Sequence, residues 1–193
     1  MSQTTDTITV LLCGVGGQGT VLAADVLARV ATAAGNVVKV SEIHGMAQRG
    51  GSVVTVVRFG SEVSSMVCDK GCADVIVSFE TTEALRALPY LKQGGQMIVS
   101  DETIKPLPVA TGKASMPSHA CERLINAGAK ILPALQLAQG AGSAKTSNVV
   151  LLGALASELS FSDEVWIDVI KHRVPPKTID ANIAAFKAGR AFA

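Results

Sequence analysis

The fold is decided by the stretch Thr9-Val10-Leu11-Leu12-Cys13-Gly14-Val15-Gly16-Gly17-Gln18-Gly19, which leads into residues 20–29. A short apolar run is followed by a glycine-rich turn and then by apolar residues at helical spacing. Such a pattern predicts a strand, a tight loop and a helix. Gly14, Gly16 and Gly19 have the G-x-G-x-x-G spacing, which in a strand-to-helix context is typical of turns that bind an anion.

Glycine suits such a turn for three physical reasons. It permits the tight turn, it lets the backbone approach an anion closely, and it lets the helix pack against its strand. Free backbone N–H groups and the positive end of the helix dipole then face the ligand. We therefore predict a cofactor-binding loop made of Gly14, Gly16, Gly17, Gln18 and Gly19. The alternative is a turn that needs its glycines only for packing.

A second strand is predicted at residues 37–41, and a right-handed connection would place it parallel to the first. Glu42 follows Gly19 by 23 positions, near the place where dinucleotide-binding folds carry an acid for the ribose. The polar, glycine-bounded run at residues 43–51 departs from that pattern directly after Glu42. An ordinary dinucleotide site therefore explains only part of this region.

The run at residues 43–51 carries His44, Gln48 and Arg49. It leaves the carboxyl end of a strand, where ligands of open α/β sheets collect. A guanidinium such as that of Arg49 binds phosphate or carboxylate through two parallel hydrogen bonds. We predict that this run and the first glycine loop form one anion-binding crevice. The alternative is a solvated loop whose arginine pairs with a nearby acid.

The remaining pattern completes a single α/β domain. Further strands are predicted at residues 52–59, 62–67, 74–79 and 96–100, of which 62–67 would form a hairpin with 52–59, and residues 130–134 are predicted to be a last strand or an extended segment. Helices are predicted at residues 81–91, 121–127, 146–159, 163–171 and 178–189, with Thr81 or Thr82 as the N-cap of the first. Residues 101–118 are expected to be irregular. The whole chain, 1–193, is therefore predicted to be one three-layer Rossmann-like domain with a mostly parallel sheet and an antiparallel hairpin.

Composition narrows the class of protein. The 193 residues are 48% hydrophobic but only 4% aromatic, which indicates an aliphatic core of the kind that parallel sheets bury under helices. A formal charge of +1 argues against nucleic-acid binding. No apolar run reaches the length of a membrane span, and the first seven residues lack a signal-peptide core. We therefore expect a cytoplasmic protein that binds neither nucleic acid nor membrane.

The four cysteines predict neither a disulfide framework nor a metal site. Cys68 and Cys72 form a C-x3-C pair, while Cys13 lies in a predicted buried strand and Cys121 in a separate segment. Iron–sulfur clusters generally need four thiolates in tighter runs. We accordingly expect no metal ligand in this chain.

Three stretches together resemble the gamma-type subunits of 2-oxoacid:ferredoxin oxidoreductases. They are Gly14-Val15-Gly16-Gly17-Gln18-Gly19, Ser41-Glu42-Ile43-His44-Gly45-Met46-Ala47-Gln48-Arg49-Gly50-Gly51 and Ser147-Asn148-Val149-Val150-Leu151-Leu152-Gly153. The middle stretch is the most specific, and it looks most like the small beta subunit of indolepyruvate ferredoxin oxidoreductases. The resemblance spans nearly the whole chain, as a single gamma-type catalytic domain.

The resemblance implies one subunit of a two-subunit enzyme that oxidatively decarboxylates arylpyruvates to acyl-CoA and CO2 and reduces ferredoxin. Thiamine diphosphate and iron–sulfur clusters would then sit on the large catalytic alpha subunit, and coenzyme A would be the co-substrate. This chain would supply no catalytic residue, would be inactive alone, and would reach ferredoxin only through the complex. The phosphates of coenzyme A match the glycine loop and Arg49 chemically.

Two other functions compete with this one. The first is a free-standing dinucleotide-binding oxidoreductase, which the glycine loop and Glu42 favour. A missing second domain with a substrate site argues against it. The second is a purely structural subunit whose loops only contact its partner. The sequence does not predict which 2-oxoacid is the substrate, because the substrate pocket would lie mostly on the partner.

Overall fold

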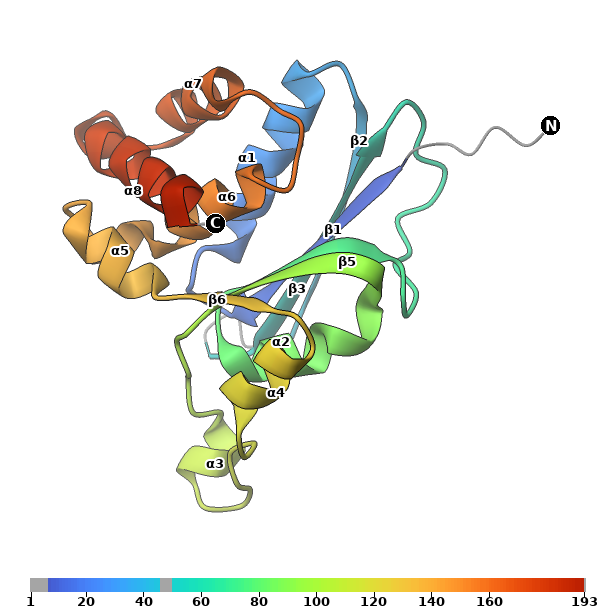
Figure 1. Cartoon of the computed structure of the whole chain (residues 1–193), viewed down its shortest axis with the longest axis vertical. Helices are drawn as coiled ribbons and strands as arrows, with labels where there is room; N and C mark the ends of the chain where they lie inside the picture. Colours follow the sequence, from blue (N-terminus) through green and yellow to red (C-terminus); the bar gives the residue numbers. More distant parts are fainter. Residues whose placement is uncertain (1–6, 46–49, 193) are drawn as a thin grey trace.

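A six-stranded sheet separates two layers of helices (Figure 1). The computed structural model describes residues 7–45 and 50–192. The strands are β1 (Ile8–Val15), β2 (Val37–His44), β3 (Ser52–Gly60), β4 (Ala73–Ser78), β5 (Leu91–Ser100) and β6 (Lys130–Leu132). The helices are α1 (Thr20–Ala33), α2 (Thr81–Ala87), α3 (Leu107–Ala110), α4 (Ala120–Asn126), α5 (Ala134–Gly140), α6 (Ser147–Ala156), α7 (Asp163–Arg173) and α8 (Ile179–Phe192), with single 3-10 turns at η1 (Leu88–Tyr90), η2 (Ala144–Thr146) and η3 (Pro176–Thr178).

The strand order is β2-β3-β1-β4-β5-β6. Strands β1, β4, β5 and β6 are parallel, whereas β3 runs antiparallel to both of its neighbours, β1 and β2. The predicted fold class, a three-layer α/β domain with a mostly parallel sheet and an antiparallel hairpin, is confirmed. Strand β2 does point the same way as β1, but β3 lies between them, so the two strands are not neighbours as they are in dinucleotide-binding folds.

The hairpin partner predicted for β3 is wrong. Residues 61–72 form no strand, and the partner of β3 is β2. Both edges of β3 are already paired, so a strand at 62–67 would find no free edge there. Side chains bind the carbonyl groups of this connection instead: Arg58 Nη1 donates to the carbonyls of Ser65 (2.8 Å) and Val67 (3.1 Å).

The α2 helix is shorter than predicted and has a different cap. It ends at Ala87, since Pro89 has no N–H to continue the helical bonds and the chain forms a 3-10 turn there. Its N-cap is the buried Glu80, not Thr81 or Thr82. Strand β5 then begins at Leu91 and includes Gly95, where an added Cβ would lie 2.9 Å from the carbonyl oxygen of Asp74. Helices α3 and α5 were not predicted.

The strands alternate their side chains between two cores. Val10 and Leu12 of β1 belong to the larger core, which α1, α6, α7 and α8 complete. Leu11 and Cys13 belong to the smaller core under α2 and α4. Figure 1 shows the two helical layers on opposite sides of the sheet and α3 in a small lobe beyond α4. Strand β2 contributes no fully buried residue to either core.

Cys68 and Cys72 form a disulfide within the connection between β3 and β4, with a Cα–Cα distance of 5.8 Å. A bridge that closes so short a loop is not a disulfide framework, but the pairing itself was not predicted. Cys13 is a buried free thiol and Cys121 an exposed one.

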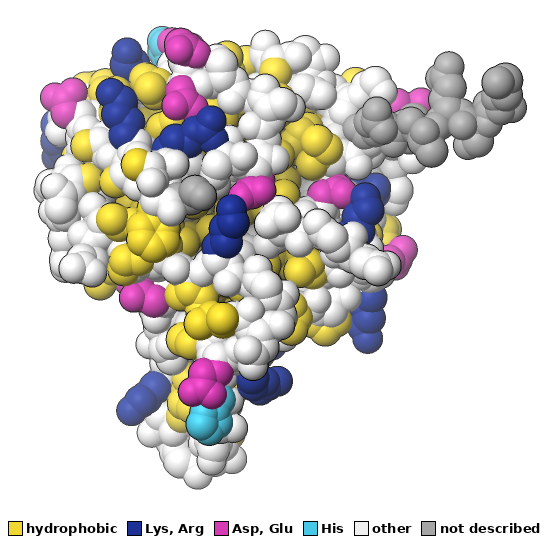
Figure 2. All heavy atoms as spheres, viewed as in Figure 1, with side chains coloured by type: hydrophobic (Ala, Val, Ile, Leu, Met, Phe, Trp, Pro, Cys, Tyr) yellow, Lys and Arg dark blue, Asp and Glu magenta, His cyan; other side chains and the backbone are white. Residues whose placement is uncertain are grey.

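Two features of the exterior bear on the expectation that the chain binds neither nucleic acid nor membrane. On the face seen in Figure 2, Lys and Arg side chains are interspersed with Asp and Glu side chains. Within the described residues, the helices all lack the combination of length and apolarity that a bilayer crossing requires.

Candidate functional site

The glycine loop joins β1 to α1 in the predicted manner. Gly17 and Gly19 have φ values of 107° and 85°, a left-handed backbone that side-chain-bearing residues rarely adopt. Gly19 is the N-cap of α1 and brings no side chain to cap it, and the first turn of the helix carries no acidic residue. The N–H groups of that turn and the positive end of the helix dipole are therefore available to an anion.

The two predicted loops lie side by side. Gly16 N donates to the carbonyl of Gly51 (2.8 Å), and Gly50 N donates to the carbonyl of Gly16 (3.2 Å). These reciprocal bonds continue the β1–β3 pairing beyond Val15 and Ser52, which face each other at the end of the strands. Because β3 pairs with β1, the end of the run at residues 43–51 lies next to the glycine loop.

A cavity of about 360 Å³ opens between the loops. It is lined by Gly16, Gly17, Gly19, Thr20, Val21, Glu42, His44 and Val53. The glycine loop and the first turn of α1 form one wall, and side chains on the α1 face of the β2–β3 hairpin form the other. Glu42 therefore does face the glycine loop, but from two strands away, not from the adjacent strand that holds the ribose acid of a dinucleotide fold.

The predicted site residues divide into four groups, the last of which is Gln18 alone. Gly16, Gly17, Gly19 and His44 line the cavity. Gly14 is buried in β1, where an added Cβ would lie 2.8 Å from the Cβ of Phe79, so close packing requires glycine there, and its predicted role in cofactor binding stays a prediction. Gln48 and Arg49 lie outside the described residues.

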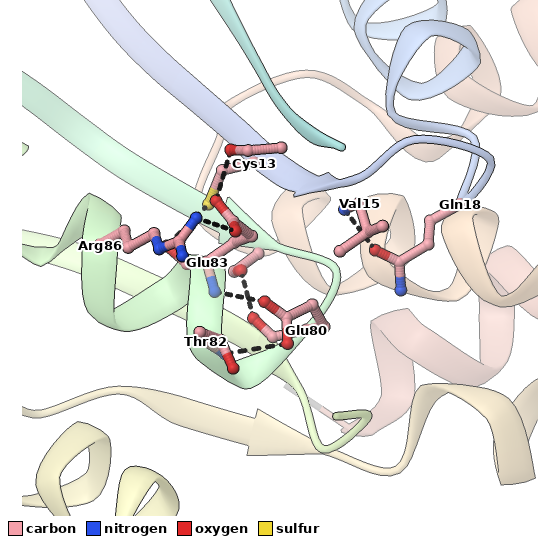
Figure 3. A network of polar contacts seen from close by, with 9 residues as sticks. Cys13, Val15, Gln18, Glu80, Thr82, Glu83 and Arg86 are labelled. Atoms are coloured by element: carbon pink, nitrogen blue, oxygen red, sulfur yellow. Dashed lines mark hydrogen bonds and ion pairs between the residues drawn. The ribbon is translucent and has the colours of Figure 1, made fainter. Parts of the chain in front are cut away.

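Gln18 turns away from the cavity. Its Oε1 accepts from Val15 N (2.8 Å), as Figure 3 shows, and its Nε2 donates to the carbonyl of Phe79 (2.9 Å) and to Glu102 Oε2 (3.3 Å). The side chain ties the glycine loop to the segments that follow β4 and β5. These bonds hold the loop in shape, and the predicted role of Gln18 in cofactor binding stays a prediction.

Asn148, in the first turn of α6, contacts the end of the glycine loop. Its Nδ2 donates to the carbonyl of Gly19 (3.4 Å), and its Oδ1 accepts from Val149 N (3.0 Å). A Cβ at Gly19 would collide with this amide, so glycine is required there both by space and by φ. No role was predicted for Asn148. The available signal was a buried amide in a helix whose other buried residues are apolar or glycine.

A second polar cluster lies on the opposite face of the sheet, around α2 (Figure 3). Glu83 Oε1 accepts from Arg86 Nη1 (2.8 Å) and Glu83 Oε2 accepts from Ser52 Oγ (2.6 Å). The Cys13 thiol donates weakly to the carbonyl of Glu83 (3.7 Å). Burial raises the pKa of Cys13 to about 12, with a smaller push from the charge of Glu83, so this thiol stays protonated and inert.

The arrangement suits binding better than covalent chemistry. The cavity between the loops offers backbone donors and a helix N-terminus, which together favour phosphate or carboxylate. Glu42, on the facing wall, can accept a hydrogen bond from a hydroxyl group of the same ligand.

Comparison with known proteins places this geometry in a family. Residues 9–192 match the family model described as pyruvate ferredoxin/flavodoxin oxidoreductase. The indolepyruvate oxidoreductase subunit IorB of Thermococcus kodakarensis is 44% identical over 187 residues, which cover 93% of each chain. The gamma subunit of a keto/oxoacid ferredoxin oxidoreductase from Geobacter sulfurreducens shares the fold, with a TM-score of 0.71 at 22% identity over 96% of this chain and 98% of that one.

A longer protein contains the same fold as one part. In the 2-oxoglutarate:ferredoxin oxidoreductase of Magnetococcus marinus, the match has a TM-score of 0.69 at 21% identity and covers 97% of this chain but 31% of that one. The relatives are thus subunits or parts of larger oxidoreductases. The present chain belongs to the pyruvate ferredoxin/flavodoxin oxidoreductase family and is a subunit of an enzyme complex of that family.

Proposed function

We propose that this chain is the small, cofactor-free subunit of a cytoplasmic indolepyruvate or arylpyruvate:ferredoxin oxidoreductase, in which it helps to hold coenzyme A. The large catalytic subunit would carry thiamine diphosphate and the iron–sulfur clusters and would pass electrons to ferredoxin. The products would be an aryl-acetyl-CoA and CO2. The relative with 44% identity, which is named for indolepyruvate, supports this substrate class.

The observation that carries the coenzyme A assignment is the cavity between the joined loops. Its wall combines the first turn of α1, free of acidic residues, with the left-handed Gly17 and Gly19. Backbone donors at a helix N-terminus favour the doubly charged phosphates of coenzyme A over a neutral ligand. Arg49, which lies outside the described residues, would add a guanidinium in the adjoining loop.

The two subunits would contribute different parts of the reaction. Thiamine diphosphate supplies the ylid that attacks the keto carbon and stabilises the carbanion left by decarboxylation. The residues of this chain would bind and orient the acyl acceptor. The chain would therefore affect the step that uses coenzyme A and leave decarboxylation itself to the partner.

The test uses Val21, which lines the cavity from the first turn of α1 and is 53% exposed. In the assembled two-subunit enzyme, Val21→Glu places a carboxylate where the phosphate would bind, and Val21→Gln is the neutral control of the same shape. An acid in the first turn also stabilises the helix, so folding is preserved. We expect Val21→Glu to raise the KM for coenzyme A at least about tenfold, because like charges repel in the cavity. The KM for indolepyruvate should not change.

Two results would contradict the proposal. If Val21→Glu and Val21→Gln have the same KM for coenzyme A as the unchanged enzyme, the cavity is not the phosphate site and the purely structural role gains support. If the isolated chain binds NAD or FAD at micromolar concentration and Glu42→Ala abolishes that binding, the chain is a dinucleotide-binding protein instead. Dinucleotide binding is tested because Glu42 lies opposite the glycine loop in the same cavity.

A further inference from the structure

One face of the sheet is covered unevenly. On this face the core under α2 and α4 includes residues of β1, β4 and β5 and extends to Val56 of β3, whereas Ser41 and Ile43 of β2 lie beyond it, beside the β3–β4 connection. A cavity of about 560 Å³ lies along this boundary. Residues of β1, β2, β3, the β3–β4 connection and α2 form its walls. We call the part formed by Ser41, Ile43, Val54, Val56, Met66 and Val67 the open face.

The open face presents large apolar side chains to solvent. Ile43 is 66% exposed, Val67 64% and Met66 47%, and all three border the same cavity. They come from two separate segments, β2 and the β3–β4 connection, so the clustering arises from the fold. Clustered exposed apolar side chains of this kind mark interaction sites on soluble proteins, whereas single ones do not.

The charged residues of the cavity are already satisfied. Arg86 donates to Glu83, and Glu83 also accepts from Ser52, so the charged pair at one end is neutral as a unit. Such a lining does not select an anionic small molecule. It suits an apolar side chain of a protein partner, with the polar pair at the edge of the contact.

We propose that the open face is the docking surface for the larger subunit of the complex, which inserts an apolar side chain into the cavity of about 560 Å³. This rests on the proposed function, in which a larger subunit completes the enzyme. A permanent interface between subunits is more apolar than the rest of a protein surface, as this one is. The related fold in the Magnetococcus marinus protein is likewise joined to a much longer chain.

The β2–β3 hairpin links this surface to the cavity between the loops. Ile43 points to the open face, and its neighbours Glu42 and His44 point to the other face, where they line that cavity. A subunit docked on the open face would therefore press on the same two strands that form one wall of the proposed coenzyme A site. Docking would then fix the strands that hold Glu42 and His44 in the wall of that site.

The experiment measures the dissociation constant between this chain and the purified larger subunit for four variants. Ile43→Asp and Val67→Asp put a charge on the open face. Leu107→Asp and Ile125→Asp are matched controls, because these residues are 75% and 58% exposed elsewhere on the molecule. Circular dichroism of each free variant checks that the fold is kept.

We expect the two open-face variants to raise the dissociation constant at least about 30-fold, as central interface residues do. The two controls should change it less than about threefold. A measurement without substitutions supplies a second test: amide hydrogen exchange in residues 37–44 and 61–72 should slow when the larger subunit binds.

Three results would overturn the proposal. The first is equal binding by all four variants together with unchanged hydrogen exchange in residues 37–44 and 61–72. The second is a dimer of this chain alone that Ile43→Asp converts to monomers, which would make a second copy the occupant. The third is failure of the unchanged chain to bind the larger subunit at all, which would overturn the proposed function as well. If the unchanged chain binds the larger subunit but the first result is obtained, the proposed function is retained and only the proposed docking surface is excluded.

Discussion

Helices α1, α6, α7 and α8 bury one face of the sheet as far as β3 and pack partly against β2, whereas the core under α2 and α4 on the other face ends at β3. The first face holds the large aromatic side chains Trp166, Phe59 and Phe186. The second has a smaller core and a cavity open to solvent. The first face therefore holds most of the buried core, whereas the second leaves the large apolar side chains of Ile43, Met66 and Val67 exposed to solvent.

The largest effect expected from this comparison is the loss of Trp166. Its side chain is fully buried between Phe161 and Phe186, with ring centroids 6.4 and 5.9 Å away. Trp166→Ala should lower the free energy of unfolding by about 3–5 kcal/mol, since it leaves a cavity in a close-packed core. Tyr90→Ala, at the edge of the open face, should cost about 1 kcal/mol or less. Urea unfolding of both variants measures the difference, and equal costs would contradict the contrast between the faces.

A smaller effect is expected where α6 crosses α8. A Cβ on Gly153 would collide with the carbonyl oxygen of Phe186, and one on Gly189 with that of Val150. Gly153→Ala should therefore destabilise the chain by about 2–3 kcal/mol, because the two helices must separate. Gly140→Ala is the control, since nothing lies within 4 Å of an added Cβ there. Thermal unfolding that ranks the control as the more damaging change would refute the close crossing.

The smallest effect concerns the periphery of the covered face. Asp25 on α1 pairs with Arg29 and with Arg173 at the end of α7. Burial works against ionisation of Asp25, but the hydrogen bonds and charges of the two arginines outweigh it and lower its pKa. The pair therefore contributes stability above the unfolded-state pKa of Asp, about 3.9, and loses it as pH falls through the lower folded value. Asp25→Asn should lower the free energy of unfolding by at most about 1 kcal/mol at pH 7 and should not change it well below pH 3. Unfolding curves of the variant and the unchanged chain at both pH values test this, and a difference that persists well below pH 3 would contradict it.

The covered face and the glycine loop were largely predictable from sequence. The β1–loop–α1 unit has a continuous apolar run, fixed glycine spacing and helical periodicity, and all three are local properties. Strands β3, β4 and β5 were recognisable because their apolar runs are long and bounded by turn residues. Their order in the sheet was not, because no local pattern states that β3 inserts between β1 and β2.

The errors share this non-local origin. The predicted strand at residues 62–67 contains Val63, Met66 and Val67, which favour strands by composition. A strand also needs a free sheet edge to pair with, and here Arg58 donates hydrogen bonds to the carbonyls of Ser65 and Val67 instead. The structural partners of Gln18, Phe79 and Glu102, lie 61 and 84 residues away in sequence, so no local pattern indicated them, and the predicted role of Gln18 in cofactor binding stays a prediction. Whether the cavity lining binds coenzyme A stays a prediction.

The place of β1 between β3 and β4 also determines the order in which this chain can fold. Val10 is flanked by Val57 and Val75, which follow it by 47 and 65 positions, whereas His44 and Val53 of the neighbouring hairpin are only 9 apart. Closing a short loop takes microseconds and costs less entropy than closing a long one. At roughly 5–20 residues per second on the ribosome, β1 emerges several seconds before its partners exist. We therefore expect the first strand to be made to be among the last to pair, so that pulse-labelled amides of β2–β3 gain protection before those of β1; the reverse order would exclude this sequence of events.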